Sequence, residues 1–307
     1  MEKYGIVYNS DEMAEVIEQA EKFGKVRAPI LIYGETGVGK ELVTKALYQN
    51  SGGLEKFVTI DCAAFSKELV ESELFGHERG AFTGAHTTRI GKFEAANKGM
   101  VFLDEVGEIP YVLQQKLLRI VETMEFCRVG SNKTVRTNVS IVTATNKDLK
   151  LEIKERRFRE DLYYRISSIT IFIPPLRSRP ADIPVLARTF TDKFISPEAI
   201  NKLMRYHWPG NVRELKNVIS YANHNTDGDK IFETDIRFDS ELFIGEKKLA
   251  LPTLDLERLE RVAIIEALRL SNYRQSEAAK LLNISSRAMN YKVQKWGIRH
   301  KGWRVFN

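Results

Sequence analysis

A glycine-rich stretch with one lysine, Gly34-Glu-Thr-Gly-Val-Gly-Lys40, has the residue types and spacing that bind phosphate groups. Glycines let backbone N–H groups approach phosphate oxygens without a Cβ in the way, and a lysine and a helix N-terminus supply positive charge. The apolar run before it and the helical spacing after it predict a strand, a loop and a helix. The sequence therefore predicts a P-loop, with the residues Gly34, Glu35, Thr36, Gly37, Val38, Gly39, Lys40 and Glu41.

Two acidic residues further along predict the second half of a nucleotide site. Asp104 and Glu105 follow the apolar run 100–103, so their carboxylates emerge at the C-terminal end of a parallel strand, where ligands collect. We expect Asp104 to hold Mg²⁺, directly or through water, and Glu105 to polarise a water for attack on the γ-phosphate. The alternative is a solvated turn. Glu41 stands where Ser or Thr usually offers a hydroxyl to magnesium, so either Glu41 helps hold the ion or another residue does. Together the two motifs favour ATP or GTP binding.

A third strand, predicted at 139–146, ends in two polar residues at the same edge of the sheet. Thr145 and Asn146 could read the γ-phosphate or the attacking water, or they could simply cap the helix that follows. Further on, Arg159 and Arg165 stand six residues apart, a spacing that one helix cannot place on a single face. They suit a site shared between subunits, and surface salt bridges are the alternative.

Composition indicates an ordinary globular chain of two or three domains: 307 residues, 43% apolar and 29% charged. The two cysteines, Cys62 and Cys127, lack metal-ligand spacing, and the five histidines share none either, so no metal beyond nucleotide-bound magnesium is expected. No run of 18 apolar residues and no apolar leader occurs, so we expect a cytoplasmic protein that does not bind a membrane. Residues 253–307 hold eleven Lys or Arg against five Asp or Glu, which is the whole net charge of +6. A polyanion partner for that end is therefore expected.

The basic C-terminal segment has helical periodicity. An apolar stripe at helical spacing is predicted to pair with a second subunit; it comprises Leu256, Leu259, Ala263, Ala267 and Leu270. Two short helices with a turn at 283–285 then predict a helix-turn-helix. Its outward residues could reach bases and phosphates of double-stranded DNA; they are Ser285, Ser286, Arg287, Asn290, Tyr291 and Lys292. A helical hairpin that serves only for dimerisation is the alternative.

One more motif is a loop, Gly80-Ala-Phe-Thr-Gly-Ala85, whose glycines suit a hairpin-like turn and whose Phe82 needs an apolar partner. With this loop, "GETGVGKE", "GMVFLDEVGEIP", "FREDLYYRI" and "WPGNVRELKN", the chain from about Tyr4 to Ile298 resembles bacterial enhancer-binding proteins. These are AAA+ ATPases that activate transcription by RNA polymerase carrying sigma-54. The resemblance implies an α/β AAA+ P-loop NTPase with a parallel sheet, a helical lid and an all-α Fis-like DNA-binding domain. We expect the ATPase subdomain at 1–173, the lid at 174–237, a linker at 238–254 and the helix-turn-helix domain at 255–307.

The resemblance also implies residue roles. It assigns the decisive sigma-54 contacts to Phe82 and Thr83, on a loop formed by Gly80, Ala81, Phe82, Thr83, Gly84 and Ala85. It makes Arg159 and Arg165 trans-acting, Thr145 and Asn146 a first sensor, and Arg213 a second sensor of the lid. Glu after the P-loop lysine is usual in this family, so Glu41 fits it.

The chain departs from the family at several positions. Asp61 replaces an Asn that links the catalytic Glu to the sigma-contacting loop, and we still assign Asp61 that switching role. Asn138 and Ser140 replace Asp and Arg, which puts in doubt a salt-bridge path from the loop near Gly130 to Arg136. The lid also lacks a segment between its first two helices.

The function expected is that of an activator that hydrolyses ATP to ADP and phosphate and binds upstream DNA as dimers. The resemblance implies that it assembles into a hexameric ring and remodels sigma-54 polymerase to open promoters. The alternative is a DNA-binding regulator whose nucleotide only controls oligomerisation. A P-loop kinase is disfavoured because nothing resembles an acceptor site. No receiver or sensory domain precedes the ATPase region, so a partner acting in trans, control of synthesis or a sensory region missing from this sequence is expected to regulate it.

Overall fold

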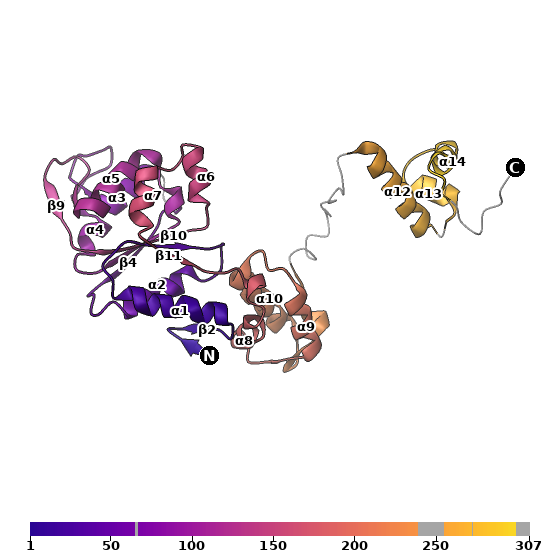
Figure 1. Cartoon of the computed structure of the whole chain (residues 1–307), viewed down its shortest axis with the longest axis horizontal. Helices are drawn as coiled ribbons and strands as arrows, with labels where there is room; N and C mark the ends of the chain where they lie inside the picture. Colours follow the sequence, from indigo (N-terminus) through magenta and orange to yellow (C-terminus); the bar gives the residue numbers. More distant parts are fainter. Residues whose placement is uncertain (65–66, 239–254, 272, 299–307) are drawn as a thin grey trace. The chain divides into compact units, whose positions relative to one another are not determined.

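The computed structural model describes residues 1–64, 67–238, 255–271 and 273–298, and it divides into two compact units, Met1–Asp239 and Ser240–Asn307 (Figure 1). Each unit is described by itself. None of the helices in these described ranges has both the length and the apolar character that a membrane span requires.

A five-stranded parallel sheet forms the centre of the first unit. In spatial order its strands are β11 (Ile169–Phe172), β3 (Ile30–Tyr33), β10 (Ser140–Thr145), β7 (Met100–Asp104) and β4 (Phe57–Asp61). Successive side chains along a strand face opposite sides, so Ile30 and Ile32 pack in one core while Leu31 packs in the other. Both faces are therefore buried, which explains why these strands read as continuous apolar runs.

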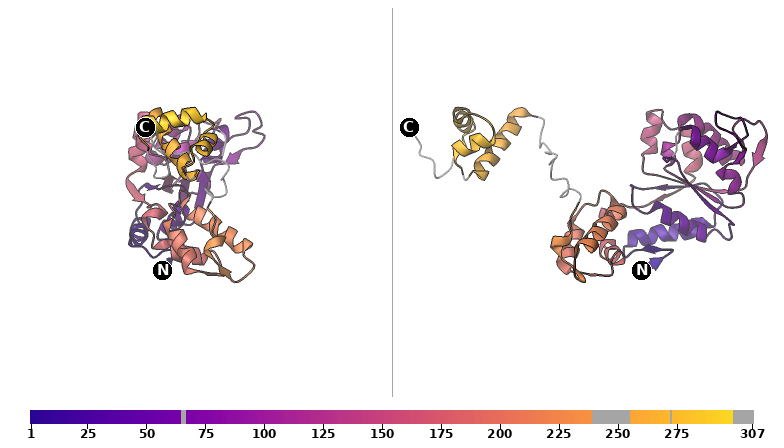
Figure 2. Two further views of the ribbon diagram at one scale, coloured as in Figure 1. Left: turned by 90° about the vertical axis from the view of Figure 1, so that its right-hand side faces the viewer. Right: turned by 180° about the vertical axis from the view of Figure 1, so that it is seen from behind.

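Helices cover both faces of the sheet (Figures 1 and 2). One face carries α1 (Asp11–Gly24) and α2 (Lys40–Gln49). The other carries α3 (Lys67–Phe75), α4 (Lys92–Ala95), α5 (Tyr111–Thr123), α6 (Leu149–Lys154) and α7 (Glu160–Ile166). The short 3₁₀ helix η1 (Val106–Glu108) follows β7. The predicted α/β class with a parallel sheet is confirmed.

Three two-stranded antiparallel ribbons extend from this core within the described residues. They are β1 (Glu2–Lys3) with β2 (Ile6–Val7), β5 (Gly76–His77) with β6 (Arg89–Ile90), and β8 (Glu125–Cys127) with β9 (Thr134–Arg136). A β-bridge between His77 and Val129 joins the second ribbon to the loop of the third. The Gly80–Ala85 loop therefore rises from the second ribbon with the β8–β9 loop beside it.

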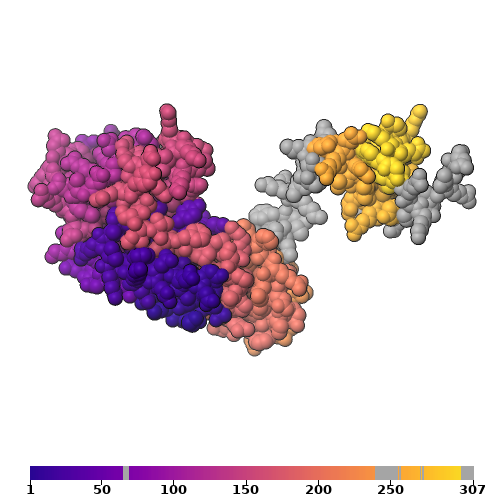
Figure 3. Space-filling view, in the orientation of Figure 1, coloured from indigo at the N-terminus to yellow at the C-terminus, as the bar shows by residue number. Residues whose placement is uncertain are grey.

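A helical lid completes the first unit. It contains η2 (Leu176–Ser178), α8 (Asp182–Thr189), β12 (Phe194–Ile195), α9 (Pro197–Arg205), α10 (Asn211–Asn225), β13 (Lys230–Ile231) and η3 (Glu233–Asp235). Its core surrounds the fully buried Trp208, whose indole N–H donates to the Leu203 carbonyl at 2.9 Å. Figure 3 shows lid atoms packed against the N-terminal residues, where the buried Asp182 accepts hydrogen bonds from the backbone of Asn9 and Ser10.

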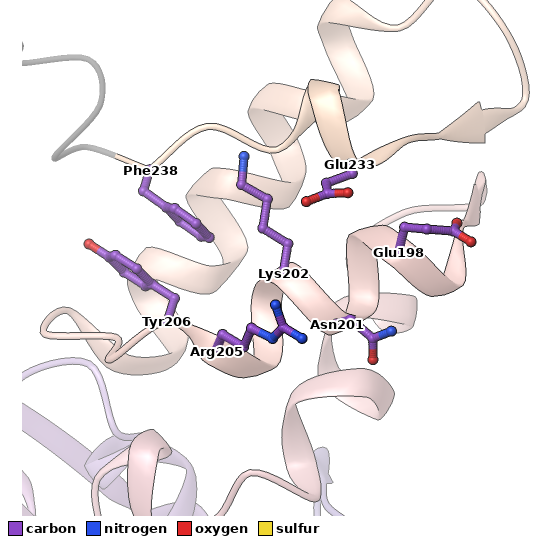
Figure 4. A pocket seen from close by; sticks show the side chains of 7 residues that line it. All are labelled: Glu198, Asn201, Lys202, Arg205, Tyr206, Glu233 and Phe238. Atoms are coloured by element: carbon purple, nitrogen blue, oxygen red, sulfur yellow. The ribbon is translucent and has the colours of Figure 1, made fainter. Parts of the chain in front are cut away.

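The lid has a surface cavity of about 360 Å³ beside α9 (Figure 4). Its lining residues are Glu198, Asn201, Lys202, Arg205, Tyr206, Glu233 and Phe238. Tyr206 stacks on Phe238 with ring centres 3.9 Å apart, and the Lys202 ammonium donates to the Ile236 carbonyl at 2.8 Å. No P-loop residue lines this cavity, so the nucleotide site lies elsewhere.

The second unit contains α12 (Leu256–Leu270), α13 (Gln275–Leu281) and α14 (Ser286–Lys295). Its core includes Ile264, Leu268 and Met289, and Asn283 turns the chain between α13 and α14 with φ of 53°. The residues of the apolar stripe expected on α12 differ in burial: Ala267 packs into this core, whereas Ala263 is exposed. The all-α class of this unit is confirmed, whereas most of the predicted linker 238–254 lies outside the described residues and the domain boundaries stay a prediction.

Candidate functional site

The P-loop connects β3 to α2 at the C-terminal edge of the sheet. Gly37 and Gly39 have φ of 80° and 108°, values that favour glycine, and α2 begins at Lys40. The Lys40 side chain is only 7% exposed, and its ammonium donates to the Gly34 carbonyl at 3.1 Å. The predicted strand, loop and helix are thus present, with the lysine folded over the loop.

Three carboxylates meet at the ends of the neighbouring strands β4 and β7. Asp61 and Asp104 are register partners, and Glu105 follows directly with a left-handed φ of 51°. Burial raises the pKa of Asp104, and the negative charges of Glu105 and Asp61 add to that shift. The Asp61 carboxylate is exposed and accepts the Ala63 N–H at 2.9 Å. This edge is rich in negative charge, which favours a bound cation.

Glu105 also connects the P-loop to the third strand. One carboxylate oxygen lies 3.2 Å from the Lys40 ammonium, and the other accepts the Asn146 N–H at 3.1 Å. The Asn146 amide in turn donates to the Thr36 hydroxyl at 2.7 Å. The structure therefore brings three separately predicted motifs into one site.

Thr145 differs from its neighbour Asn146. Its side chain is fully buried, and its hydroxyl accepts the Lys147 N–H at 3.1 Å. The helix α6 that follows is capped by Asp148, whose carboxylate accepts the Lys150 N–H at 3.0 Å. Capping of α6, the alternative for Thr145 and Asn146, is therefore the role of Asp148. Asn146 thus contacts Glu105 and Thr36, while the side chain of Thr145 is buried.

Glu35 and Glu41 of the P-loop form ion pairs with residues outside the group of Lys40, Glu105 and Asn146. The Glu41 side chain is 59% exposed and pairs with Lys45 at 2.8 Å, one turn along α2. Glu35 turns toward the lid, where Arg177 donates two hydrogen bonds to its carboxylate and holds the Glu35 pKa down to about 2. Both carboxylates are therefore engaged in ion pairs with other side chains.

The lid also brings Arg213 to the P-loop. Val212 donates its N–H to the Gly37 carbonyl at 3.0 Å, and a Cβ on Gly37 would lie 3.0 Å from the Cβ of Arg213. Arg213 itself is exposed on α10. The sequence analysis did not identify two lid residues that contact the P-loop. Arg177, in "PPLRSRPADIP", pairs with Glu35, and Asn211, in "WPGNVREL", donates its side-chain amide to the Thr36 carbonyl at 3.0 Å.

Arg159 and Arg165 lie at opposite ends of α7, with Arg159 at its N-cap and Arg165 in its last turn. The Arg159 guanidinium pairs with Asp161 at 2.6 Å, which raises the Arg159 pKa. Among the described residues, no hydrogen bond or ion pair joins either arginine to the P-loop of the same chain. This placement is compatible with action on a neighbouring subunit.

The Gly80–Ala85 loop closes on itself through two backbone hydrogen bonds, from Gly80 to the Ala85 carbonyl at 2.9 Å and from Ala85 to the Phe82 carbonyl at 3.0 Å. Phe82 is 42% exposed and lies edge-on against the His77 ring, with centres 5.0 Å apart. Thr83 is exposed. The loop therefore presents a half-covered aromatic ring and a hydroxyl to its surroundings.

The β8–β9 ribbon supports this loop. Arg128 pairs with Glu78 at 2.8 Å and with Glu94 at 2.7 Å, and a Cβ on Gly130 would come within 2.7 Å of the Ala81 Cβ. At the other end of the ribbon Arg136 pairs with Glu125 at 2.7 Å.

The two residues that depart from the family beyond this ribbon take no part in its ion pairs. Asn138 accepts the Lys98 N–H through its carbonyl at 2.8 Å, and Ser140 is buried in β10. The ion pairs near the loop thus depend on Arg128, and Asn138 and Ser140 contribute none to them.

The helix-turn-helix residues occupy two different settings. Ser285 caps α14 by accepting the Ala288 N–H at 3.1 Å, while Ser286, Arg287, Asn290 and Tyr291 are exposed. Lys292 is half-buried instead, pairs with Glu260 on α12, and lies 5.7 Å above the Trp296 ring. Five of the six predicted residues are therefore exposed and Lys292 is half-buried, while Ser285 and Lys292 also make contacts within the unit.

Three family models match consecutive parts of the chain. Residues 6–172 match the family described as the sigma-54 interaction domain. Residues 177–242 match an AAA+ ATPase lid domain, and residues 255–296 match the bacterial regulatory protein, Fis family. The first match alone covers more than half of the chain.

Similar proteins include bacterial regulators. The regulatory protein AtoC of Escherichia coli K12 is 41% identical over 95% of this chain and 68% of its own length. A Nif-specific regulatory protein of Azotobacter vinelandii is 42% identical over 96% of this chain, but the match spans only 60% of that protein. The formate hydrogenlyase transcriptional activator FhlA of Escherichia coli K12 is 49% identical over 71% of this chain and 33% of its own length.

Solved structures of NtrX from Brucella abortus have a similar fold. One superposes with a TM-score of 0.72 at 29% identity, over 95% of this chain and 69% of that one. The structures of NtrX with ADP and with ATP superpose with TM-scores of 0.69 and 0.70, at 28% and 29% identity, and cover 95% of this chain and 70% and 69% of theirs. Because the first match covers 95% of this chain, it includes residues of both units.

Proposed function

The chain belongs to the family of sigma-54 interaction domains, and from that premise we propose that it is an ATP-hydrolysing transcription activator. In this proposal the second unit binds upstream DNA, the first assembles into a hexameric ring, and ATP hydrolysis remodels sigma-54 RNA polymerase so that promoters open. In this proposal the protein works in the cytoplasm, and its control comes from a partner acting in trans, from control of its synthesis or from a sensory region missing from this sequence. The observation that carries the ATPase part is the meeting of Lys40, Glu105 and Asn146 in one site.

The residues present fit ATP with Mg²⁺. A P-loop with two left-handed glycines and a buried lysine supplies N–H groups and one positive charge to the phosphates. Burial, and after it the negative charges of Glu105 and Asp61, raise the pKa of Asp104, and a cation bound there would stabilise its ionised form. Bound Mg²⁺ neutralises charge on the triphosphate, and Asp104 would hold it.

Each remaining residue then has one task. Lys40 binds the phosphates, Glu105 accepts the proton of a water whose oxygen bonds to the γ-phosphorus as the bond to ADP breaks, and Asn146 keeps Glu105 oriented. Arg159 and Arg165 stabilise the transition-state charge in the neighbouring protomer, and Arg213 contacts the γ-phosphate from the lid. Asp61, the register partner of Asp104, couples nucleotide hydrolysis to movement of the Gly80–Ala85 loop.

The exposed Phe82 and Thr83 carry the sigma-54 part of the proposal. A half-exposed aromatic ring costs free energy in water, so it favours burial against a partner. The loop connects the two strands of the β5–β6 ribbon and lies beside the ion pairs of Arg128 with Glu78 and Glu94. In this proposal, rearrangement of these ion pairs lets the loop move.

In the DNA-binding part, the exposed Arg287, Asn290 and Tyr291 of α14 reach base edges and phosphates in a major groove. Ser286 contributes a further hydroxyl beside them. The positive charge of residues 253–307 supports this placement.

The test is formation of a native-gel complex between the full chain and sigma-54 in the presence of ADP and aluminium fluoride. We expect a stable complex with the wild-type protein, none with Thr83→Ala, and normal complex with Thr87→Ala, which makes the same change just outside the loop. Wild-type ATPase activity without any complex would favour a DNA-binding regulator that uses nucleotide only for oligomerisation.

A further inference from the structure

The lid holds the P-loop by its backbone carbonyl groups. Three consecutive P-loop carbonyls accept hydrogen bonds from lid residues: Thr36 from the Asn211 amide at 3.0 Å, Gly37 from the Val212 N–H at 3.0 Å, and Val38 from the Arg179 guanidinium at 2.9 Å. The backbone N–H groups of such a loop bind phosphate, so its carbonyls are free for these contacts. A displacement of the lid must therefore act on the loop that binds nucleotide.

Glu35 adds the charged contact of this interface. Its carboxylate accepts two hydrogen bonds from Arg177, at 2.8 and 2.5 Å, in the paired geometry that suits a guanidinium and a carboxylate. It also accepts the Asn211 amide at 3.1 Å. Asn211 is fully buried, has a left-handed φ of 53°, and accepts the Leu176 N–H at 2.8 Å through its other side-chain atom. We call these three residues, Glu35, Arg177 and Asn211, the Glu35 cluster.

The Glu35 cluster connects two separate lid segments to one residue of the P-loop. Arg177 belongs to η2, which leads from the sheet into the lid, and Asn211 is the first residue of α10. Arg213 follows two residues after Asn211 on the same first turn. Any rotation of that turn about the P-loop therefore moves Arg213 as well.

We propose that the Glu35 cluster is a positioning device, which sets the lid against the P-loop so that Arg213 reaches the γ-phosphate. Glu35 thus acts through Arg213 and not on the nucleotide directly. The inference rests on the proposed ATPase function. It predicts that loss of the cluster lowers affinity for ATP selectively, because the β-phosphate of ADP is still held by the P-loop backbone and Lys40.

The experiment measures binding of ADP and of a non-hydrolysable ATP analogue to the full chain by calorimetry. For Arg177→Gln we expect the affinity for the analogue to fall about fivefold, since the ion pair is partly exposed, while ADP affinity changes by less than about twofold. Arg177→Lys keeps the charge but loses the paired geometry and should fall between Arg177→Gln and wild type. Arg274→Gln, which removes an exposed ion pair with Glu277 in the other unit, should bind both nucleotides normally.

A double-mutant cycle separates positioning from general damage. If Glu35 and Arg177 act through each other, Glu35→Gln with Arg177→Gln should be no worse than either single variant. Equal losses for ADP and the analogue, or no change for either, would overturn the positioning role while leaving the proposed function intact. A wild-type chain that binds neither nucleotide would overturn the proposed function itself and remove the premise of this inference.

Discussion

The two glycine-rich loops of the first unit use glycine for different physical reasons. In the P-loop, a Cβ on Gly37 would overlap the Gly210 carbonyl of the lid, and its φ is 80°. In the Gly80–Ala85 loop, Gly80 and Gly84 have φ of 83° and 100°, but a Cβ on either would meet no atom within 4 Å. One loop needs glycine for close contact as well as conformation, and the other needs it for conformation alone.

This difference matches the surroundings of the loops. The P-loop is held on its carbonyl side by the lid and by Lys40 on its own helix, so it forms a fixed frame for a small ligand. The Gly80–Ala85 loop is held at its base and open at its tip, which suits the proposed contact with a large partner. Four substitutions test this contrast.

Gly37→Ala should have the largest effect, because a methyl group there would overlap a backbone oxygen and sit in a left-handed conformation. We expect ATP affinity to fall about a hundredfold and the free energy of unfolding to drop by about 2 kcal/mol. Calorimetry with ATP and urea unfolding measure the two quantities. Near-normal ATP binding would show that the lid does not press on the P-loop as the contact implies.

Gly130→Ala should affect the second loop and spare the first. The new methyl group would lie 2.7 Å from the Ala81 Cβ at a φ of 78°, so the Gly80–Ala85 loop must shift. We expect sigma-54 complex formation to fall about tenfold and ATPase activity of the chain alone to stay within about twofold of wild type. Equal losses in both assays would mean that the two loops are not separable in this way.

Gly84→Ala should have a smaller effect, because the substitution adds backbone strain at a left-handed φ but no steric clash. The expected cost is about 1 kcal/mol of local stability at a φ of 100°, with ATP affinity unchanged. Hydrogen exchange of residues 80–85 measures the local cost. A loss of ATP affinity in this variant would contradict the independence of the tip from the nucleotide site.

The ionisation of Glu35 should have the smallest effect. Arg177 holds its pKa down to about 2 from an ordinary 4.5, so ionised Glu35 stabilises the folded state above pH 4.5, and this contribution disappears as the pH falls through about 2. Because the pair is partly exposed, the stability difference between wild type and Glu35→Gln should stay below about 1 kcal/mol. The urea midpoints of the two proteins should converge from pH 5 to pH 2. A difference between the midpoints that stayed constant over this range would exclude the Glu35–Arg177 ion pair as its cause.

The sequence predicted the motifs better than their mutual contacts. Lys40, Glu105 and Asn146 were assigned to one site because parallel strands end at one edge, and the structure joins them there. Arg177 and Asn211 could not be linked to Glu35 from sequence, since nothing local indicates which loop a distant arginine will contact. Lys292 is expected from the sequence to face outward, but it pairs with Glu260 on α12, a helix that α13 separates from α14 along the chain. Long-range polar pairing depends on the finished fold.

Lys40 and Glu105 lie 3.2 Å apart and serve as each other's counterion. A triphosphate that reaches Lys40 brings its own negative charge and competes with the carboxylate for the same ammonium. In the proposed mechanism, nucleotide binding is thereby an exchange of counterions, and Glu105, the anion that leaves Lys40, is the group that would take the proton from water. On that proposal the base would become available only when the nucleotide is bound, so Glu105 would be ready to act only in the presence of its substrate.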